Sequence, residues 1–93
     1  MPKLDGWYLL SHWGIPKVKA GPDPFFMGGI VSEDEQGRFD DGTLIYTSKV
    51  IKFDPENNLA VTKSGTHYRL GNASVDYLAS LESHTAKLTD FTK

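Results

Sequence analysis

Apolar and polar positions alternate most clearly in the second half of the chain. The stretch 41–71, DGTLIYTSKVIKFDPENNLAVTKSGTHYRLG, holds three runs rich in β-branched and aromatic residues, separated by two compact turn signals. Pro55 presets φ for the first reversal, and Ser64-Gly65 is typical of a two-residue hairpin turn. The pattern predicts an antiparallel three-stranded meander with strands over 43–53, 59–63 and 66–70.

The first of these predicted strands does not keep one apolar face. Leu44 and Tyr46 share one side, whereas Ile51 and Phe53 fall on the other. One extra residue exchanges the two faces of a strand. We therefore expect a bulge or bend at Thr47–Lys49 that lets both halves turn their apolar groups inward.

Two further strands are expected upstream. Gly6–Trp13 is apolar on both faces, which predicts a strand that is covered on both sides or lies partly in an interface. Phe25–Val31 is the second, and its Gly28-Gly29 pair indicates a sharp bend or a close approach by another backbone. The proline- and glycine-rich segment 14–24 between them is a loop, either packed down or functional and mobile.

The end of the chain predicts a helix that begins at Asn72 or Ser74 and continues to about Leu88. Its apolar positions recur at helical spacing and predict a face docked on the sheet: Val75, Leu78, Leu81 and Leu88. The expected fold is α+β, a small antiparallel five-stranded bent sheet or open SH3-like barrel with a C-terminal α-helix. The 93 residues are expected to form a single domain, 1–93.

Composition narrows the kinds of function. The chain has no Cys, no signal-peptide pattern and no apolar run of the roughly 20 residues that a membrane span needs, so we expect a soluble cytoplasmic protein. Its net charge is −2, and no basic stripe is visible. Because nucleic-acid binders need positive charge to displace counterions, no nucleic-acid partner is expected.

Negative charge is concentrated in the loop Ser32–Gly42, SEDEQGRFDDG. The spacing of its carboxylates does not match that of a calcium-binding EF-hand loop. The loop is either simply solvated or a contact surface for a basic partner. Its candidate protein-binding residues are the five carboxylates Glu33, Asp34, Glu35, Asp40 and Asp41.

No chemistry-bearing motif emerges elsewhere. His12, His67 and His84 lack the close spacing of a zinc motif, so no metal and no cofactor are predicted. The chain has no Gly-x-Ser-x-Gly elbow, no Cys nucleophile and no phosphate-binding loop. We therefore expect no enzymatic activity.

The eleven aromatic residues are a better guide to function. Several have side chains that combine an apolar body with a polar tip: Trp7, Trp13, Tyr46, Tyr68 and Tyr77. Such residues either anchor protein interfaces or fill the core. Trp13 and Tyr46 are the two that we expect at a binding surface.

The segments 39–50, FDDGTLIYTSKV, and 61–71, VTKSGTHYRLG, resemble short bacterial proteins of the mobile-element or prophage type. The resemblance covers residues 37–71, and it carries no activity that could be assigned to a residue. It implies a small domain that binds and blocks a host-encoded protein or complex. An inhibitor of a bacterial defence system, such as an anti-CRISPR protein, is one form of that function.

The sequence thus predicts a non-enzymatic protein-binding module. The first alternative is a self-associating scaffold protein, in which an uncovered sheet edge or the N-terminal strand forms a homodimer. The second is a small enzyme or ligand binder, which requires a pocket with at least two convergent polar groups.

Overall fold

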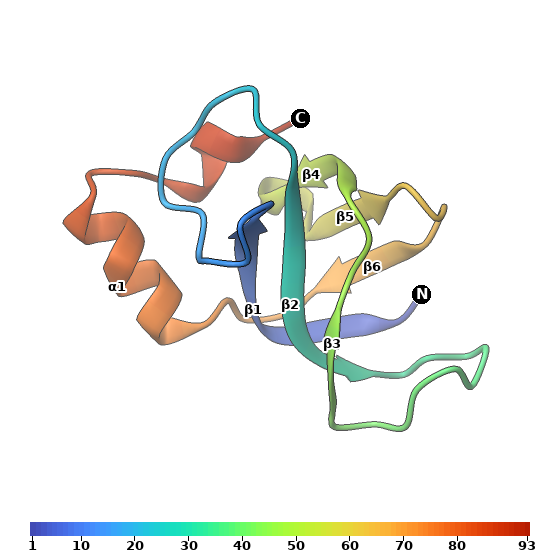
Figure 1. The fold of residues 1–93 in the computed structure, drawn as a ribbon. Coiled ribbons are helices and arrows are strands. Elements are labelled where there is room, and N and C mark those ends of the chain that lie inside the picture. The colour runs from blue at the N-terminus through green and yellow to red at the C-terminus, as the bar shows by residue number, and fades with distance from the viewer.

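The computed structural model describes residues 1–93 and contains six strands, one α-helix and two short 3₁₀ helices (Figure 1). The strands are β1 (Lys3–Ser11), β2 (Phe25–Ser32), β3 (Thr43–Tyr46), β4 (Val50–Asp54), β5 (Leu59–Thr62) and β6 (His67–Leu70). The helices are η1 (Pro55–Asn57), α1 (Val75–Ser83) and η2 (Leu88–Phe91).

The strands form one mixed sheet in the order β3-β2-β1-β6-β5-β4. Its central pair, β1 with β6, is parallel, and the other four pairs are antiparallel. The α+β class with a C-terminal helix is confirmed, but the prediction of five antiparallel strands is wrong. The parallel pair joins residues that are more than sixty positions apart, and no local pattern in the sequence encodes such a contact.

The predicted strand 43–53 is in fact two strands, which lie at opposite edges of the sheet. Only Thr47–Lys49 separates β3 from β4, so the sheet must roll to bring its two edges together. The edges form no ladder with each other, and the sheet is therefore not closed into a barrel.

The chain does bend at Thr47–Lys49 as predicted, but the orientation predicted for β3 is wrong. Ile45 faces the core, whereas Leu44 and Tyr46 are 50% and 64% exposed. In β4 the core positions are Val50 and Phe53, because a bulge shifts the register between Val50 and Lys52. The outward side chains of β3 prove important for the site described below.

The meander over β4, β5 and β6 is confirmed, and its turns follow the predicted chemistry. The Asp54 carboxylate accepts a hydrogen bond from the backbone N–H of Asn57, and Asn58 has a left-handed conformation with φ 55°. Gly65 has φ 89° in the second turn, a conformation that glycine adopts without strain. These two local turns place β4, β5 and β6 side by side in the sheet.

The core is one cluster of 15 buried residues enclosed by the rolled sheet. Its aromatic rings meet edge to face: Trp7 with Phe53, and Phe25 with both Phe53 and Phe91. Phe91 in η2 anchors the end of the chain, where the backbone groups of Lys93 and Phe53 bond to each other. The last residues therefore cover the outer edge of β4.

The helix is shorter than predicted and buries a different stripe. It ends at Ser83, and Thr85 then adopts a left-handed conformation. Tyr77 and Leu81 are buried, whereas Val75 is 80% exposed and Leu78 is also exposed. Of the predicted docking face, Leu81 is correct, Leu88 packs against the core from η2 and not from the helix, and the other two residues are wrong. The α-helix is neither long enough nor apolar enough to cross a membrane.

Candidate functional site: the outer face of β1, β2 and β3

A glycine flanked by two tyrosines lies at the centre of the candidate site. Tyr8 of β1 is paired with Gly28 of β2, and Gly28 is paired with Tyr46 of β3. A Cβ atom on Gly28 would lie 2.6 Å from Cζ and from Oη of Tyr8, so the tyrosine ring lies across the backbone of β2. The close approach predicted at the Gly28-Gly29 pair is thus made by a side chain at Gly28, and by the backbone of β1 at Gly29.

The same face of the sheet carries more apolar residues in register. Leu10 is paired with Phe26, and Ile30 is paired with Leu44. Side chains alternate between the two faces of a strand, so these residues share the outer face with Tyr8 and Tyr46. We call this set the outer apolar face: Tyr8, Leu10, Phe26, Ile30, Leu44 and Tyr46. None of the six is fully buried.

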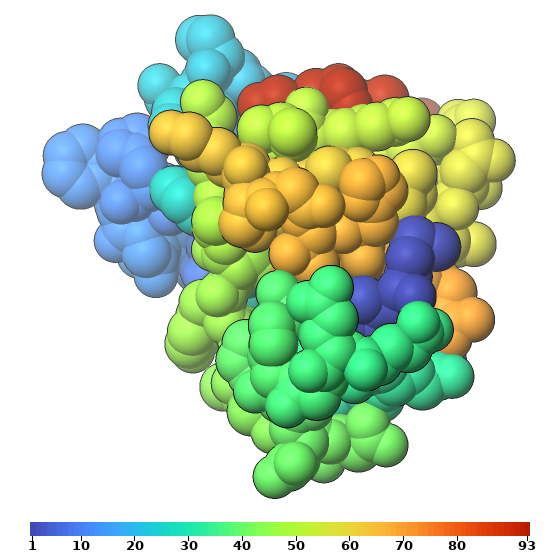
Figure 2. All heavy atoms as spheres, turned by 90° about the vertical axis from the view of Figure 1, so that its right-hand side faces the viewer, coloured from blue at the N-terminus to red at the C-terminus, as the bar shows by residue number.

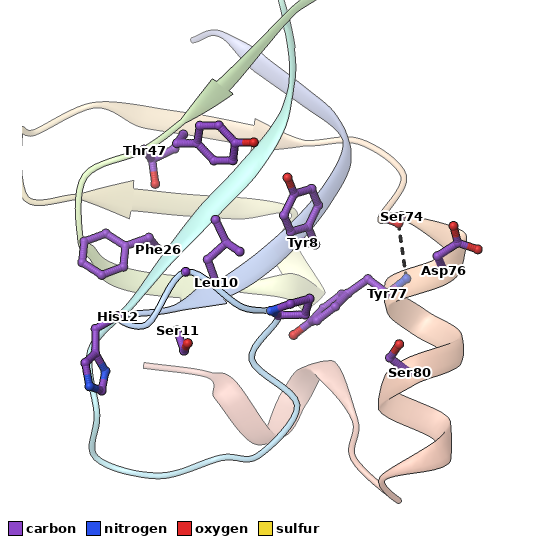
Figure 3. A pocket seen from close by; sticks show the side chains of 13 residues that line it. Tyr8, Leu10, Ser11, His12, Phe26, Thr47, Ser74, Asp76, Tyr77 and Ser80 are labelled. Atoms are coloured by element: carbon purple, nitrogen blue, oxygen red, sulfur yellow. Dashed lines mark hydrogen bonds between the residues drawn. The ribbon is translucent and has the colours of Figure 1, made fainter.

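A cleft of about 810 Å³ lies between the outer apolar face and α1 (Figure 3). Tyr8, Leu10 and Phe26 form its floor, and Tyr46 and Thr47 lie on the β3 side. The helix contributes the opposite wall with Ser74, Asp76, Tyr77 and Ser80, and the loop after β1 contributes Ser11, His12, Gly14 and Pro16.

The helical wall is firmly attached to β1 and to the loop 14–24. The backbone N–H of Ser74 donates to the carbonyl of Trp7 (2.8 Å), and the Ser74 hydroxyl caps the helix by accepting from the N–H of Tyr77. The Tyr77 hydroxyl donates to the carbonyl of Lys17 at 2.5 Å. Burial raises the pKa of the Tyr77 phenol well above its ordinary value, which keeps the donor protonated.

The loop 14–24 is itself packed down at this point. The N–H of Lys17 donates to the carbonyl of Leu9, and Val18 packs against the core, whereas Ile15 stays exposed. The cleft is therefore preformed by backbone hydrogen bonds on its helix and loop sides.

The polar groups of the cleft are mostly hydroxyls. Asp76 is its only carboxylate, and this side chain forms no ion pair within the chain. Partial burial raises the pKa of the Tyr8 phenol, and the neighbouring Tyr46 phenol raises it further. The Tyr8 hydroxyl is thus neutral at ordinary pH and can donate a hydrogen bond. No cluster of three or more His, Asp or Glu side chains could hold a metal ion.

The acidic loop, predicted as a contact surface, uses most of its carboxylates internally. The Asp34 side chain is only 1% exposed and accepts hydrogen bonds from the backbone N–H groups of Gln36, Arg38 and Phe39, at 3.0–3.3 Å. The guanidinium of Arg38 lies 3.6 Å from the same carboxylate. Asp34 therefore holds the turn of the loop together.

The remaining carboxylates of the loop tie it to its neighbours. Glu33 pairs with Arg69 at 2.6 Å, and Glu35 pairs with the N-terminal amino group at 3.3 Å. Asp41 accepts from the backbone N–H of Glu33, and only the Asp40 side chain has no partner. Figure 2 shows the loop, in green, against the orange segment around β6 and the dark blue N-terminus.

The two predicted aromatic contact residues lie close to one cleft. Tyr46 lines it, and Trp13, 78% exposed, packs against the cleft residue His12 with ring centroids 4.7 Å apart and the rings tilted by 41°. The acidic loop lies on the other side of the molecule from α1 (Figure 1). The structure thus separates the seven predicted residues into two groups.

Sequence reasoning missed several residues of the cleft: Tyr8, Leu10, Phe26 and Asp76. The signal for the first two was the double-sided apolar pattern of the N-terminal strand, but the register with β2 was needed to place them beside Tyr46. Comparisons with protein-family models, with curated proteins and with solved structures found no match.

Proposed function

We propose that this protein is a non-enzymatic protein-binding module that contacts its partner through the outer apolar face and the adjoining cleft. The observation that carries the proposal is the row of apolar side chains in register across β1, β2 and β3, with Leu44 and Tyr46 left largely exposed. Contiguous exposed apolar surface on a small domain is typical of an interaction site.

The extent of this surface favours a protein partner over a small molecule. The exposed residues continue beyond the cleft in two directions, to Ile30 and Leu44 on the sheet and to Trp13 and Ile15 on the loop. Exposed aromatic side chains beside a preformed hollow are the usual anchors of a protein interface. Blocking a host protein, as the mobile-element resemblance implies, is one use of such a face.

The acidic loop supports this function less well. Charge attracts a basic partner only where it is not already neutralised, and Glu33, Glu35 and Asp34 all face cations or N–H groups of the chain itself. The carboxylate of Asp40 is the only one in the loop that forms no hydrogen bond or ion pair. We therefore assign the primary contact to the outer apolar face.

A selection for displayed peptides and protein fragments that bind the purified chain tests the proposal. Binders should lose at least about tenfold in affinity for a Leu44→Ser, Tyr46→Ser double variant, because interface anchors contribute about 1–2 kcal/mol each. The matched control is Ile51→Ser, an exposed apolar residue on β4, and it should bind as the wild type does. Equal binding by all three proteins, or no binders at all, would contradict the proposal.

Small-ligand binding is a second candidate, favoured by the size of the cleft and by its polar groups. A volume of about 810 Å³ lies within the range of small-molecule sites. The hydroxyls of Tyr8, Tyr46 and Ser80 and the carboxylate of Asp76 supply the convergent polar groups that this function requires. A fragment screen by NMR should then shift the resonances of cleft residues and leave Ile30 and Leu44 unaffected.

Self-association is a third use of the same surface. β3 is an edge strand with no neighbour on its outer side, and its exposed side chains are apolar. Light scattering over a dilution series distinguishes this function, because a homodimer formed through β3 should dissociate in the Leu44→Ser, Tyr46→Ser variant.

A further inference from the structure

We infer that the cleft takes an extended segment of the partner protein, with apolar residues over Tyr8, Leu10 and Phe26 and a Lys or Arg side chain paired with Asp76. The inference rests on the proposed function and specifies the chemistry of its ligand. The cleft crosses the strands instead of following them, since its residues come in turn from β3, β2, β1 and α1. A ligand in it therefore passes from Tyr46 to the helix.

The width of the floor sets the length of the segment. Neighbouring strands lie about 4.8 Å apart, so the path from β3 to β1 is roughly 10 Å. An extended chain advances about 3.3 Å per residue, and about three residues cover that distance. The helical wall that carries Asp76 lies beyond β1 and continues this path (Figure 3).

The hydroxyl groups around the floor favour an extended backbone over a helical one. The cleft residues Tyr8, Tyr46 and Ser80 carry hydroxyls that form no hydrogen bond to the backbone of this protein. The hydroxyls of Tyr8 and Tyr46 lie next to each other, and each keeps further hydrogen-bonding capacity for a ligand. An extended ligand has free N–H and C=O groups that must find partners when they leave water, whereas a helix satisfies its own. These three hydroxyls supply such partners.

The charge of Asp76 determines the third feature of the ligand, after its apolar residues and its extended backbone. Asp76 lies in the first turn of α1, where the helix dipole stabilises a carboxylate. It is exposed, has no cation of the chain as a partner, and is the only carboxylate of the cleft. The complementary group on a ligand that passes over the apolar floor is a Lys or Arg side chain.

The test uses short random peptides displayed for selection on the wild-type chain. Selected peptides should carry a Lys or Arg a few residues from an apolar pair. Their affinity should fall about fivefold for Asp76→Asn, the upper range for an exposed ion pair, and the loss should shrink at high ionic strength. The matched control is Asp40→Asn, which removes the same charge from a carboxylate without side-chain partners and should leave the affinity unchanged.

A charge exchange sharpens the assignment. Asp76→Lys should reject the selected peptides, and replacing their Lys or Arg with Glu should restore binding to that variant alone. Peptides that depend on Leu44 and Tyr46 but bind Asp76→Asn and wild type equally would overturn this inference and leave the proposed function intact. Failure to select any peptide that is sensitive to the Leu44→Ser, Tyr46→Ser variant would overturn both.

Discussion

The outer apolar face and the loop Ser32–Gly42 both adjoin β2, but they use their side chains in different ways. In the loop, carboxylates accept hydrogen bonds from nearby backbone or pair with neighbouring cations, as Asp34 and Glu33 do. On the apolar face, Leu44 and Tyr46 are left largely exposed, although each has a large apolar side-chain surface that could be buried.

This difference shows which of the two surfaces is the stronger indication of a binding partner. A carboxylate on a loop has a local use, since it can organise the turn around it or be solvated at little cost. An exposed apolar side chain has no comparable local use, and its exposure forgoes the free energy of burial. Uncovered apolar groups in register are therefore the stronger indication of a partner. Four sets of variants test this distinction between the loop and the apolar face.

The largest effect is expected from Asp34→Ala. Three backbone N–H groups lose their common acceptor, and we expect the free energy of unfolding to fall by about 2 kcal/mol. Urea denaturation measures the change, and hydrogen exchange should accelerate at residues 36–39. Asp40→Ala is the matched control and should change stability by less than about 0.5 kcal/mol. Equal effects of the two variants would mean that Asp34 does not organise the loop.

Tyr77→Phe tests how the helical wall of the cleft is held. Loss of the hydrogen bond to Lys17 should cost about 1 kcal/mol. Burial raises the pKa of Tyr77 in the folded protein above the value near 10 of an unfolded chain. The unfolded state therefore loses this proton first, so wild-type stability is complete below about pH 10 and declines as the pH rises further.

Urea unfolding at about pH 8 and about pH 11 checks this dependence. The decline in the free energy of unfolding between the two conditions should be smaller in Tyr77→Phe than in the wild type. Part of the decline should persist, because burial also raises the pKa values of Tyr8 and Tyr68. An identical decline in both proteins would show that Tyr77 is not the buried phenol responsible.

Gly28→Ala should disturb the cleft more than the fold. The new methyl group meets the end of the Tyr8 ring at 2.6 Å, and the ring can swing away, so we expect a stability loss of about 1 kcal/mol or less. NMR should show shifted Tyr8 ring resonances, and the selected peptides should bind more weakly.

Gly29→Ala is the control for the same strand. Its Cβ would meet Cβ of Trp7 at 3.2 Å and the backbone of Asp5 at 3.3 Å, so it should perturb the N-terminal strand and leave the Tyr8 resonances in place. Peptide binding that survives in Gly28→Ala with its affinity unchanged would remove Tyr8 from the binding surface.

The smallest effect is expected from the double variant Glu33→Gln, Glu35→Gln. Both carboxylates are largely exposed, and solvent-exposed ion pairs contribute little to stability. Unfolding by urea and the affinity for the selected peptides should both remain unchanged within error. A clear loss of peptide binding would return the acidic loop to the interaction surface.

Local chemistry made part of this structure predictable. The reversal at Pro55 and the turn at Gly65 depend on residues within a few positions of one another. Of the strands that they connect, β6 alternates in the expected way, whereas a bulge in β4 turns Ile51 outward. The pattern of the N-terminal strand was also informative, because apolar groups on both of its faces indicated a second contact surface. Trp13 and Tyr46 were expected at a binding surface because their side chains combine an apolar body with a polar tip, although the orientation predicted for β3 turned Tyr46 inward.

Tertiary structure decided the rest. The parallel pairing of β1 with β6 places the N-terminal strand at the centre of the sheet, and this contact spans most of the chain. Rolling of the sheet sends Leu44 and Tyr46 outward, and the docking of α1 buries Tyr77 in place of Val75. Each of these outcomes depends on which other strand or helix packs against the element. The sequence pattern within the element does not specify that neighbour.

The sequence alone therefore determined where most of the strand-forming segments lie and where the meander turns. Only the folded chain decided that Tyr8, Gly28 and Tyr46 would form one row and that Asp76 would lie beside it. The physical reason is that turns and alternation arise from short-range sterics, whereas a site assembled from four elements depends on register between strands far apart in the chain.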